Sequence, residues 1–161
     1  IAIVAILVAV AFPSFEGSIR NNRLASATNE MLASLSLARM EALRNPEGAV
    51  LCATADGTTC GNDWNGGWMV FVDVNGDGAP GGVNDRVVHY VQGKDRMIVN
   101  SSSAGGAAFA NRIRFDNRGR IDQHTRTLTL QPDTCPSGEQ LQRAIAVGLT
   151  GQARTTRVAC S

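Results

Sequence analysis

The sequence contains little of what a catalytic site needs. Its 161 residues include two histidines, and no H-E-x-x-H, G-x-S-x-G or P-loop motif occurs. The four cysteines are even in number, and oxidation to disulfides would remove the thiolate that a cysteine nucleophile requires. We therefore expect that the protein is not an enzyme.

The chain also lacks a large net charge. The value of +1 excludes a strong overall attraction to nucleic acid or to an anionic membrane. Residues 1–110 nevertheless carry seven basic and ten acidic side chains, whereas residues 111–161 carry eight arginines and four acidic side chains. Hydrophobic residues make up 43% of the chain, which excludes wholesale disorder and allows a packed core. Because arginines outnumber acidic side chains in residues 111–161, an anion-binding site is expected in this last third of the chain.

The apolar run at the start is too short to cross a bilayer by itself. Ile1 to Phe12 would form about 18 Å of helix, whereas a membrane span needs about 20 residues. Three interpretations are open: a buried core helix, the core of a signal peptide, or the end of a membrane helix that begins further upstream. The pattern that follows argues against a signal peptide, because a helical repeat continues directly from this run.

A helical pattern extends from Ser14 to Arg44. Apolar residues spaced three and four apart form one stripe, while most polar residues, Ser34 among them, are expected off it; the stripe consists of Leu24, Ala27, Met31, Leu35, Ala38 and Ala42. Asn45-Pro46 ends the pattern, because proline cannot continue the hydrogen-bond ladder. The sequence predicts one helix over 1–44, apolar all round over 1–13 and amphipathic over 14–44, with a candidate kink at Pro13.

After Pro46 the pattern changes to period two. Clusters of Gly, Asn, Asp and Ser separate seven strand-like runs: Trp68–Val74, Arg86–Val91, Met97–Val99, Arg112–Phe115, Thr127–Leu130, Ala144–Leu149 and Thr155–Ala159. Residues 45–161 are therefore predicted to form a β-rich globular head. The predicted fold class is α+β, with an antiparallel sheet that covers the stripe of the helix.

The four cysteines allow three disulfide pairings. We favour Cys52–Cys60, which lie eight residues apart around a turn, and Cys135–Cys160, which bracket the C-terminal strands. Free buried thiols are the alternative, and the spacing matches no zinc site. Disulfides would indicate an oxidising compartment, either the periplasm or the exterior.

The sharpest local motif is the D-x-N-x-D-G run that starts at Asp73. Its candidate ligands Asp73, Asn75 and Asp77, with Asp85 further along, present oxygen atoms that suit Ca²⁺. An EF-hand would place Glu at the position of Asn84, and a strand precedes the loop here instead of a helix. The alternative is an acidic hairpin turn, in which Asp, Asn and Gly are favoured for backbone reasons. Calcium is the one cofactor that the sequence suggests.

The arginines near the C-terminus form a second group of candidate residues. Arg120, Arg143, Arg154 and Arg157 are candidates for binding phosphate, which arginine contacts in a bidentate manner. Neighbouring Arg112 and Arg114 alternate with Ile113 and Phe115, and are expected on the solvated face of a strand. The alternative is an ordinary surface whose arginines pair with nearby aspartates, and charge alone favours it.

Three segments together resemble a known family. They are the apolar helix with a central proline (AILVAVAFPSF), its Arg39-Met40-Glu41-Ala42 end, and the strand Gly67–Asp73 before an Asn-Gly loop. This pattern resembles the type IV minor pilins of the FimT/FimU group, and the H-type pseudopilins of type II secretion share it. The resemblance covers nearly the whole chain.

The resemblance implies a type IV pilin fold and two successive cellular locations, one before and one after assembly of the pilus. The helix would first be held in the inner membrane with the head in the periplasm. It would then pack among neighbouring major and minor pilins in the extracellular pilus fibre of a Gram-negative bacterium. The resemblance also implies a prepilin peptidase site and a glutamate upstream of Ile1.

The functions of this group divide. FimU-like members join other minor pilins in a tip complex that primes assembly, and FimT-like members bind DNA for natural transformation through a Gly-Arg-x-Arg motif. That position reads Gly151-Gln152-Ala153-Arg154 here, so the first arginine is missing. In a regular strand Arg154 and Arg157 face opposite sides, so both would need a loop to contact one DNA backbone.

We expect a minor pilin that takes part in pilus assembly at or near the tip. DNA uptake through Arg143, Arg154, Arg157 and Arg120 is the first alternative. An H-type pseudopilin of type II secretion is the second.

Overall fold

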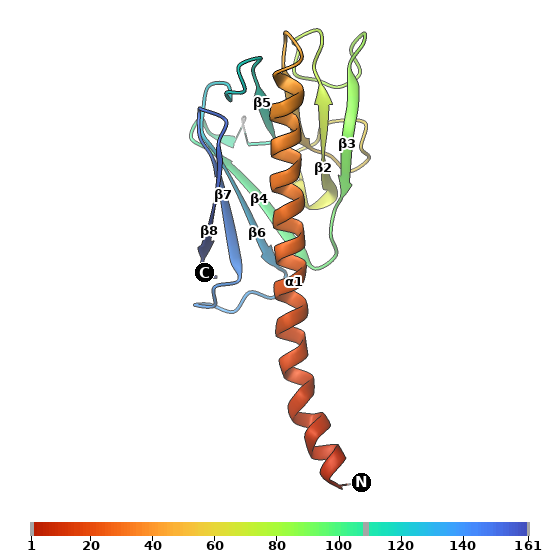
Figure 1. Ribbon diagram of the computed structural model, residues 1–161, viewed down its shortest axis with the longest axis vertical. Helices are drawn as coiled ribbons and strands as arrows, with labels where there is room; N and C mark the ends of the chain where they lie inside the picture. The colour runs from red at the N-terminus through yellow and green to blue at the C-terminus, as the bar shows by residue number, and fades with distance from the viewer. Residues whose placement is uncertain (1, 108–109, 161) are drawn as a thin grey trace.

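The computed structural model shows one long helix that extends from a β-rich head (Figure 1). The structure describes residues 2–107 and 110–160, with the side chains of the helix described from Gly17 onward. Helix α1 (Ala2–Ala42) is continuous through Pro13, and its axis bends near its N-terminal end. No helix in the part of the chain described here has an apolar stretch that could span a membrane.

The C-terminal end of α1 comes two residues before the predicted one. After Ala42 the backbone forms a turn in which the Asn45 side chain donates a hydrogen bond to the carbonyl of Glu41 at 2.7 Å. This side chain satisfies a carbonyl that the next helical N–H would otherwise have bound. Pro46 then follows outside the helix, as predicted.

The predicted stripe of α1 forms the centre of the hydrophobic core. All six residues of the stripe are buried, none more than 2% exposed. One prediction for this helix is wrong: Ser34 was expected off the stripe, but it is fully buried. Its hydroxyl accepts a hydrogen bond from the indole N–H of Trp68 at 2.9 Å, and this bond compensates the burial of a polar group.

The head contains two antiparallel sheets, where the sequence predicted one. The first has the strand order β3-β2-β1-β5, with the bounds β1 (Ala49–Ala53), β2 (Gly67–Val72), β3 (Arg86–Gln92) and β5 (Arg112–Phe115). The second has the order β4-β6-β7-β8, with the bounds β4 (Met97–Ser103), β6 (Arg126–Pro132), β7 (Gln142–Val147) and β8 (Ala153–Val158). A short 3₁₀ helix, η1 (Trp64–Gly66), precedes β2. Helix α1 packs against both sheets.

Strand β1 is the element that the sequence analysis missed. It lies between β2 and β5, and all five of its residues are buried. Leu51 faces the core under α1, while Val50 and Cys52 belong to a second cluster with Met69 and Phe71 on the other face of the sheet. A strand buried on both faces has no alternation of polar and apolar residues. Strand β2 is also buried throughout, but its Trp, Phe and Val residues have high β propensity, whereas two of the five residues of β1 are alanine.

Both predicted disulfides are confirmed. Cys52–Cys60 links β1 to the segment that follows it, and Cys135–Cys160 links the loop before β7 to the end of the chain after β8. No free cysteine remains.

Candidate functional site

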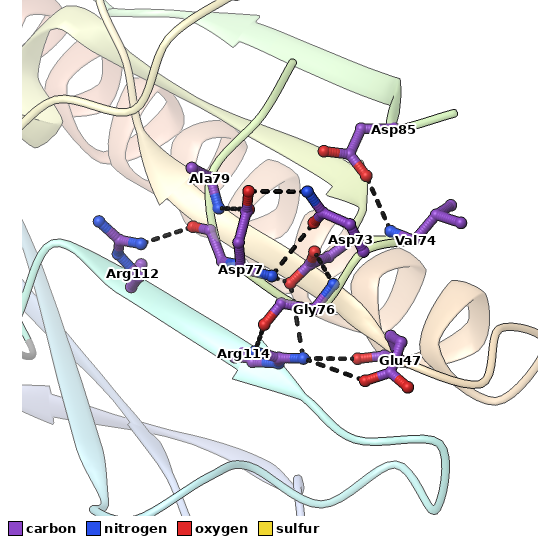
Figure 2. Close-up of polar contacts among 11 residues, drawn as sticks. Glu47, Asp73, Val74, Gly76, Asp77, Ala79, Asp85, Arg112 and Arg114 are labelled. Atoms are coloured by element: carbon purple, nitrogen blue, oxygen red, sulfur yellow. Dashed lines mark hydrogen bonds and ion pairs between the residues drawn. The ribbon is translucent and has the colours of Figure 1, made fainter. Parts of the chain in front are cut away.

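The loop between β2 and β3 brings three carboxylates together (Figure 2). Oxygen atoms of Asp73, Asp77 and Asp85 lie within 4.8 Å of one another. Asp73 directly follows β2 and is fully buried, and its two oxygens accept hydrogen bonds from the N–H groups of Gly76 at 2.8 Å and Gly78 at 2.9 Å. Both glycines have positive φ, which lets the backbone wrap around this carboxylate.

Two arginines of β5 hold the loop from the side. Arg112 donates to the carbonyl of Gly78, and Arg114 donates to the carbonyl of Gly76 at 2.8 Å. The guanidinium of Arg114 also lies 3.6 Å from the Asp73 carboxylate and donates to the carbonyl of Glu47 at 3.0 Å.

The prediction that Arg112 and Arg114 lie on a solvated face is therefore wrong. Both are half-buried, because the loop covers the face of β5 that points away from α1. Their positions opposite Cys52 and Val50 of β1 place them beside the second apolar cluster. The available signal was an acidic loop upstream of two arginines with the spacing i, i+2, but sequence alone does not show which segment covers which face.

The predicted calcium ligands are partly assembled. Asn75 uses its amide N–H to bind Asp77 at 2.7 Å, and its oxygen accepts from the Asp77 backbone at 3.1 Å. All six carboxylate oxygens of the three aspartates accept an N–H hydrogen bond. Bonds from the Ala79 backbone and the Asn75 side chain lower the pKa of Asp77. Each oxygen keeps a second lone pair, so a hard cation has possible ligands, while Arg114 already supplies a positive charge. Calcium binding stays a prediction.

Two of the predicted anion-binding residues meet at the edge of the second sheet. Arg143 of β7 and Arg157 of β8 lie directly opposite each other in the register of the two strands. Both line a cleft of about 510 Å³, together with Asn21, Asn22, Ala25, Glu139, Gln140 and Leu141. Partial burial and the positive charge of Arg157 lower the pKa of Arg143. Neither arginine forms an ion pair within the part of the chain that the structure describes.

Arg154 lies on the other face of the same strand. It is opposite Ala146 of β7, and β8 keeps a continuous register from Ala153 to Val158. Since side chains of a strand alternate between faces, Arg154 and Arg157 point to opposite sides, as the sequence analysis expected for a regular strand. The loop that would bring both to one DNA backbone is therefore not formed. The preceding turn is tight, with the N–H of Gly148 donating to the carbonyl of Gln152 at 3.0 Å.

Arg120 belongs to a different region from Arg143 and Arg157. Its guanidinium pairs with Asp116 at 3.2 Å in the turn after β5. Burial acts to raise the pKa of this carboxyl, but hydrogen bonds from the backbone N–H groups of Arg120 and Arg118 hold it below its usual range. The carbonyl of Gly119 accepts from Arg39 at 3.0 Å, so this turn lies level with the last turns of α1. The cleft with Arg143 lies at Asn21, about 27 Å away along the helix axis.

The first part of α1 projects beyond the head. Among the described side chains of α1, Leu24 is the first that belongs to the core. Figure 1 shows the helix continuing well past the ends of the strands toward the N-terminus. The head therefore does not cover this part of the helix.

Comparisons with known proteins agree with this architecture. The model of the GspH family, described as type II transport protein GspH, matches residues 27–151. The structure is similar to the type IV minor pilin FimU of Pseudomonas aeruginosa in one crystal form, at 20% identity and a TM-score of 0.60, covering 84% of this chain and 89% of that one. In a second crystal form of FimU the values are 19%, 0.57, 82% and 91%. No curated protein matches the chain.

The family model covers well over half of the chain, and the structural similarity extends over the helix and the head. The resemblance inferred from the helix and from the Gly67–Asp73 strand is confirmed. The chain therefore belongs to the GspH family, and it has the fold of the type IV minor pilin FimU.

Proposed function

We propose that this protein is a minor pilin that takes part in type IV pilus assembly at or near the tip. The observation that carries the proposal is the projecting part of α1, whose sequence from Ile1 to Phe12 is apolar on all sides. A helix that is apolar all round needs other apolar groups to cover it. In the proposed function, lipids of the inner membrane cover it first, and helices of neighbouring pilins cover it in the assembled fibre.

The comparisons support two versions of this role. FimU is described as a type IV minor pilin, which favours a subunit of the pilus. The family description, a type II transport protein, favours the pseudopilin of a secretion system. Deleting the gene separates them: loss of surface pili supports the first version, and loss of type II secretion with normal pili supports the second. The two disulfides agree with a head in the periplasm and later outside the cell.

Replacing Val8 by arginine is expected to abolish incorporation into the pilus. A charged side chain in an apolar helical environment costs about 2.5–3.5 kcal/mol by membrane-insertion scales. The measurement is the amount of the subunit in sheared pili relative to whole cells, by immunoblot. The control Val8→Leu keeps an apolar side chain and is expected to assemble normally. Normal incorporation of Val8→Arg would contradict the proposed packing of this helix.

A second candidate function is DNA capture during natural transformation. It is favoured by β8, an exposed edge strand that carries Arg154 and Arg157 without an ion pair among the described residues. The side chains of Arg154 and Arg157 lie on opposite faces of β8, so duplex DNA would have to contact this edge strand from both sides. Arg120 already has a carboxylate partner and contributes less to this candidate.

Fluorescence anisotropy with duplex DNA at several salt concentrations tests DNA capture. If DNA binds here, Arg154→Ala and Arg157→Ala should each weaken binding and reduce the slope of log affinity against log salt by about one. Arg86→Ala is the control, because Arg86 is also exposed but pairs with Glu41 at 3.6 Å and lies on β3, at the edge of the other sheet. Absence of binding at low salt would exclude this candidate.

A further inference from the structure

We propose that one end of the head binds the phosphate groups of anionic phospholipids while the protein is in the membrane. We call this end the base and define it by Arg20, Arg23, Arg143 and Arg157. The inference rests on the proposed function, in which the apolar start of α1 lies in the bilayer. It adds a second contact with the membrane, made by the head.

The base lies at the end of the head from which α1 projects, where the loop between β6 and β7 extends further toward the N-terminus (Figure 1). Arg143 and Arg157 share a cleft with Asn21, Asn22 and Ala25 of α1, so the two strands end beside the same turns that carry Arg20 and Arg23. The ends of β7 and β8 near this cleft lie where α1 leaves the head (Figure 1).

The distance along α1 places the base at the membrane surface. Arg20 lies seven positions after Pro13, which corresponds to about 10 Å of helix. Asn21 and Ala25, beside Arg143 and Arg157, lie eight and twelve positions after Pro13, about 12 and 18 Å along the helix. The headgroup layer of a bilayer is about 5–8 Å thick beyond the hydrocarbon core. Long arginine side chains extend toward such a layer while their Cα atoms remain outside it. If the apolar segment ends at the edge of the hydrocarbon, the guanidinium group of Arg20 comes within reach of lipid phosphates, and Arg143 and Arg157 extend toward the same layer from beside Asn21 and Ala25.

The charges of the base are not compensated within the head. Arg143 and Arg157 lie opposite each other, an arrangement that like charges disfavour. The Nε atom of Arg20 is buried and has no hydrogen-bond partner among the described residues. Arg23 is exposed and forms no ion pair among the described residues. One terminal nitrogen of Arg143 donates to the carbonyls of Gln140 at 3.0 Å and Gln142 at 3.1 Å. A phosphate group at the base would relieve the repulsion and accept hydrogen bonds from the remaining N–H donors.

The other charges at this end are largely neutralised. Lys94 pairs with Glu30 at 3.0 Å, and Arg96 pairs with Asp133 at 3.1 Å. Glu139, in the cleft, and Asp95, near Arg23, are the described acidic side chains at this end without an ion pair. The sequence adds Glu16, four positions before Arg20, so the four arginines of the base outnumber these three acidic residues by one. DNA offers the same phosphate chemistry, but the position beside the apolar helix favours a lipid.

Binding of the full chain to vesicles tests this inference. One set of vesicles contains only phosphatidylcholine, and the other contains equal parts of phosphatidylcholine and phosphatidylglycerol. We expect tighter binding to the anionic vesicles, and expect it to decrease with salt. The double variant Arg143→Gln/Arg157→Gln should bind anionic vesicles about 25-fold more weakly, about fivefold for each arginine, with no change on neutral vesicles.

Three further variants control for net charge and for folding. Arg86→Gln/Arg118→Gln removes the same charge outside the base and should leave binding unchanged. Arg143→Lys/Arg157→Lys keeps the charge and should retain most of the binding. If the glutamine variant of the cleft does not fold, as judged by its thermal unfolding, Arg20→Gln/Arg23→Gln on the exposed part of α1 should give the same loss.

Each other outcome overturns the inference in a distinct way. Equal affinity for neutral and anionic vesicles would exclude a role of the base and leave the membrane stage of the proposed function intact. No binding to either kind would overturn both. Equal losses in the cleft variant and in the Arg86/Arg118 variant would reduce the effect to general surface charge. Tighter binding of the base arginines to duplex DNA than to anionic vesicles would assign the base to DNA.

Discussion

Replacing Trp68 by alanine is expected to lower the free energy of unfolding of the head by about 3–5 kcal/mol. Trp68 lies on β2 in the core under α1 and is 1% exposed. The substitution leaves a cavity and removes the indole N–H that binds the buried hydroxyl of Ser34 at 2.9 Å. Domains of this size are stable by about 5–15 kcal/mol, so this loss is a large share of the total.

Denaturant unfolding followed by circular dichroism measures this effect. The control Ser34→Ala removes the hydroxyl but keeps the indole, and a buried hydrogen bond of this kind contributes about 1 kcal/mol. Ser34 also donates to the carbonyl of Glu30 at 2.9 Å, a bond within α1 that the Trp68 variant retains. A loss in Trp68→Ala no larger than in Ser34→Ala would contradict the central role of the indole in joining helix and sheet.

Removing the Cys135–Cys160 disulfide is expected to lower the free energy of unfolding by about 3 kcal/mol. The bond closes a separation of 25 residues in the sequence, and the unfolded chain gains entropy when it is absent. It also holds the end of β8, an edge strand with β7 as its one neighbour. Two backbone hydrogen bonds support the link: Gly138 donates to the carbonyl of Cys160 at 3.0 Å, and Cys160 donates to that of Glu139 at 2.8 Å.

The double variant Cys135→Ser/Cys160→Ser should therefore show two effects. Global stability falls, and amide hydrogens of β8 exchange faster than those of β1, because an edge strand opens more easily once its end is released. The matched control is Cys52→Ser/Cys60→Ser, which opens a separation of eight residues and affects the first sheet instead. Unchanged exchange in β8 would show that its pairing with β7 alone holds this edge.

Loss of the Cys135–Cys160 disulfide should also affect both proposed anion-binding functions, DNA capture and the binding of anionic phospholipids. Arg157 lies three residues before Cys160, and Arg143 lies across from it. If the end of β8 loosens, the two guanidinium groups no longer share one cleft with α1. Weaker binding of phosphate-bearing partners should therefore accompany loss of the disulfide, with Arg154 on the opposite face less affected.

Local patterns in the sequence were sufficient for much of the fold. The stripe from Leu24 to Ala42 repeats with the period of a helix, and every residue of it is buried. The alternating run after Gly67 is β2, and the glycine- and aspartate-rich segments are loops. The disulfide partners also followed from their spacing. These features depend on neighbours in the sequence, so the sequence records them directly.

The sequence by itself thus determined the helix, its buried face, most strands and the cysteine pairs. Only the tertiary structure decided which segments of the chain pack against each face of the sheets. Strand β1 escaped prediction because burial on both faces removes its alternation and because its alanines have low β propensity, unlike the aromatic and β-branched residues of the equally buried β2. The roles of Arg112 and Arg114 depend on a loop that folds over them from more than thirty residues away. Arg154 and Arg157 are close in sequence, but the pleat of β8 places them on opposite faces, and Arg120 lies apart from both in the turn at Gly119. Such contacts join residues distant along the chain, and no local pattern encodes which of them will meet.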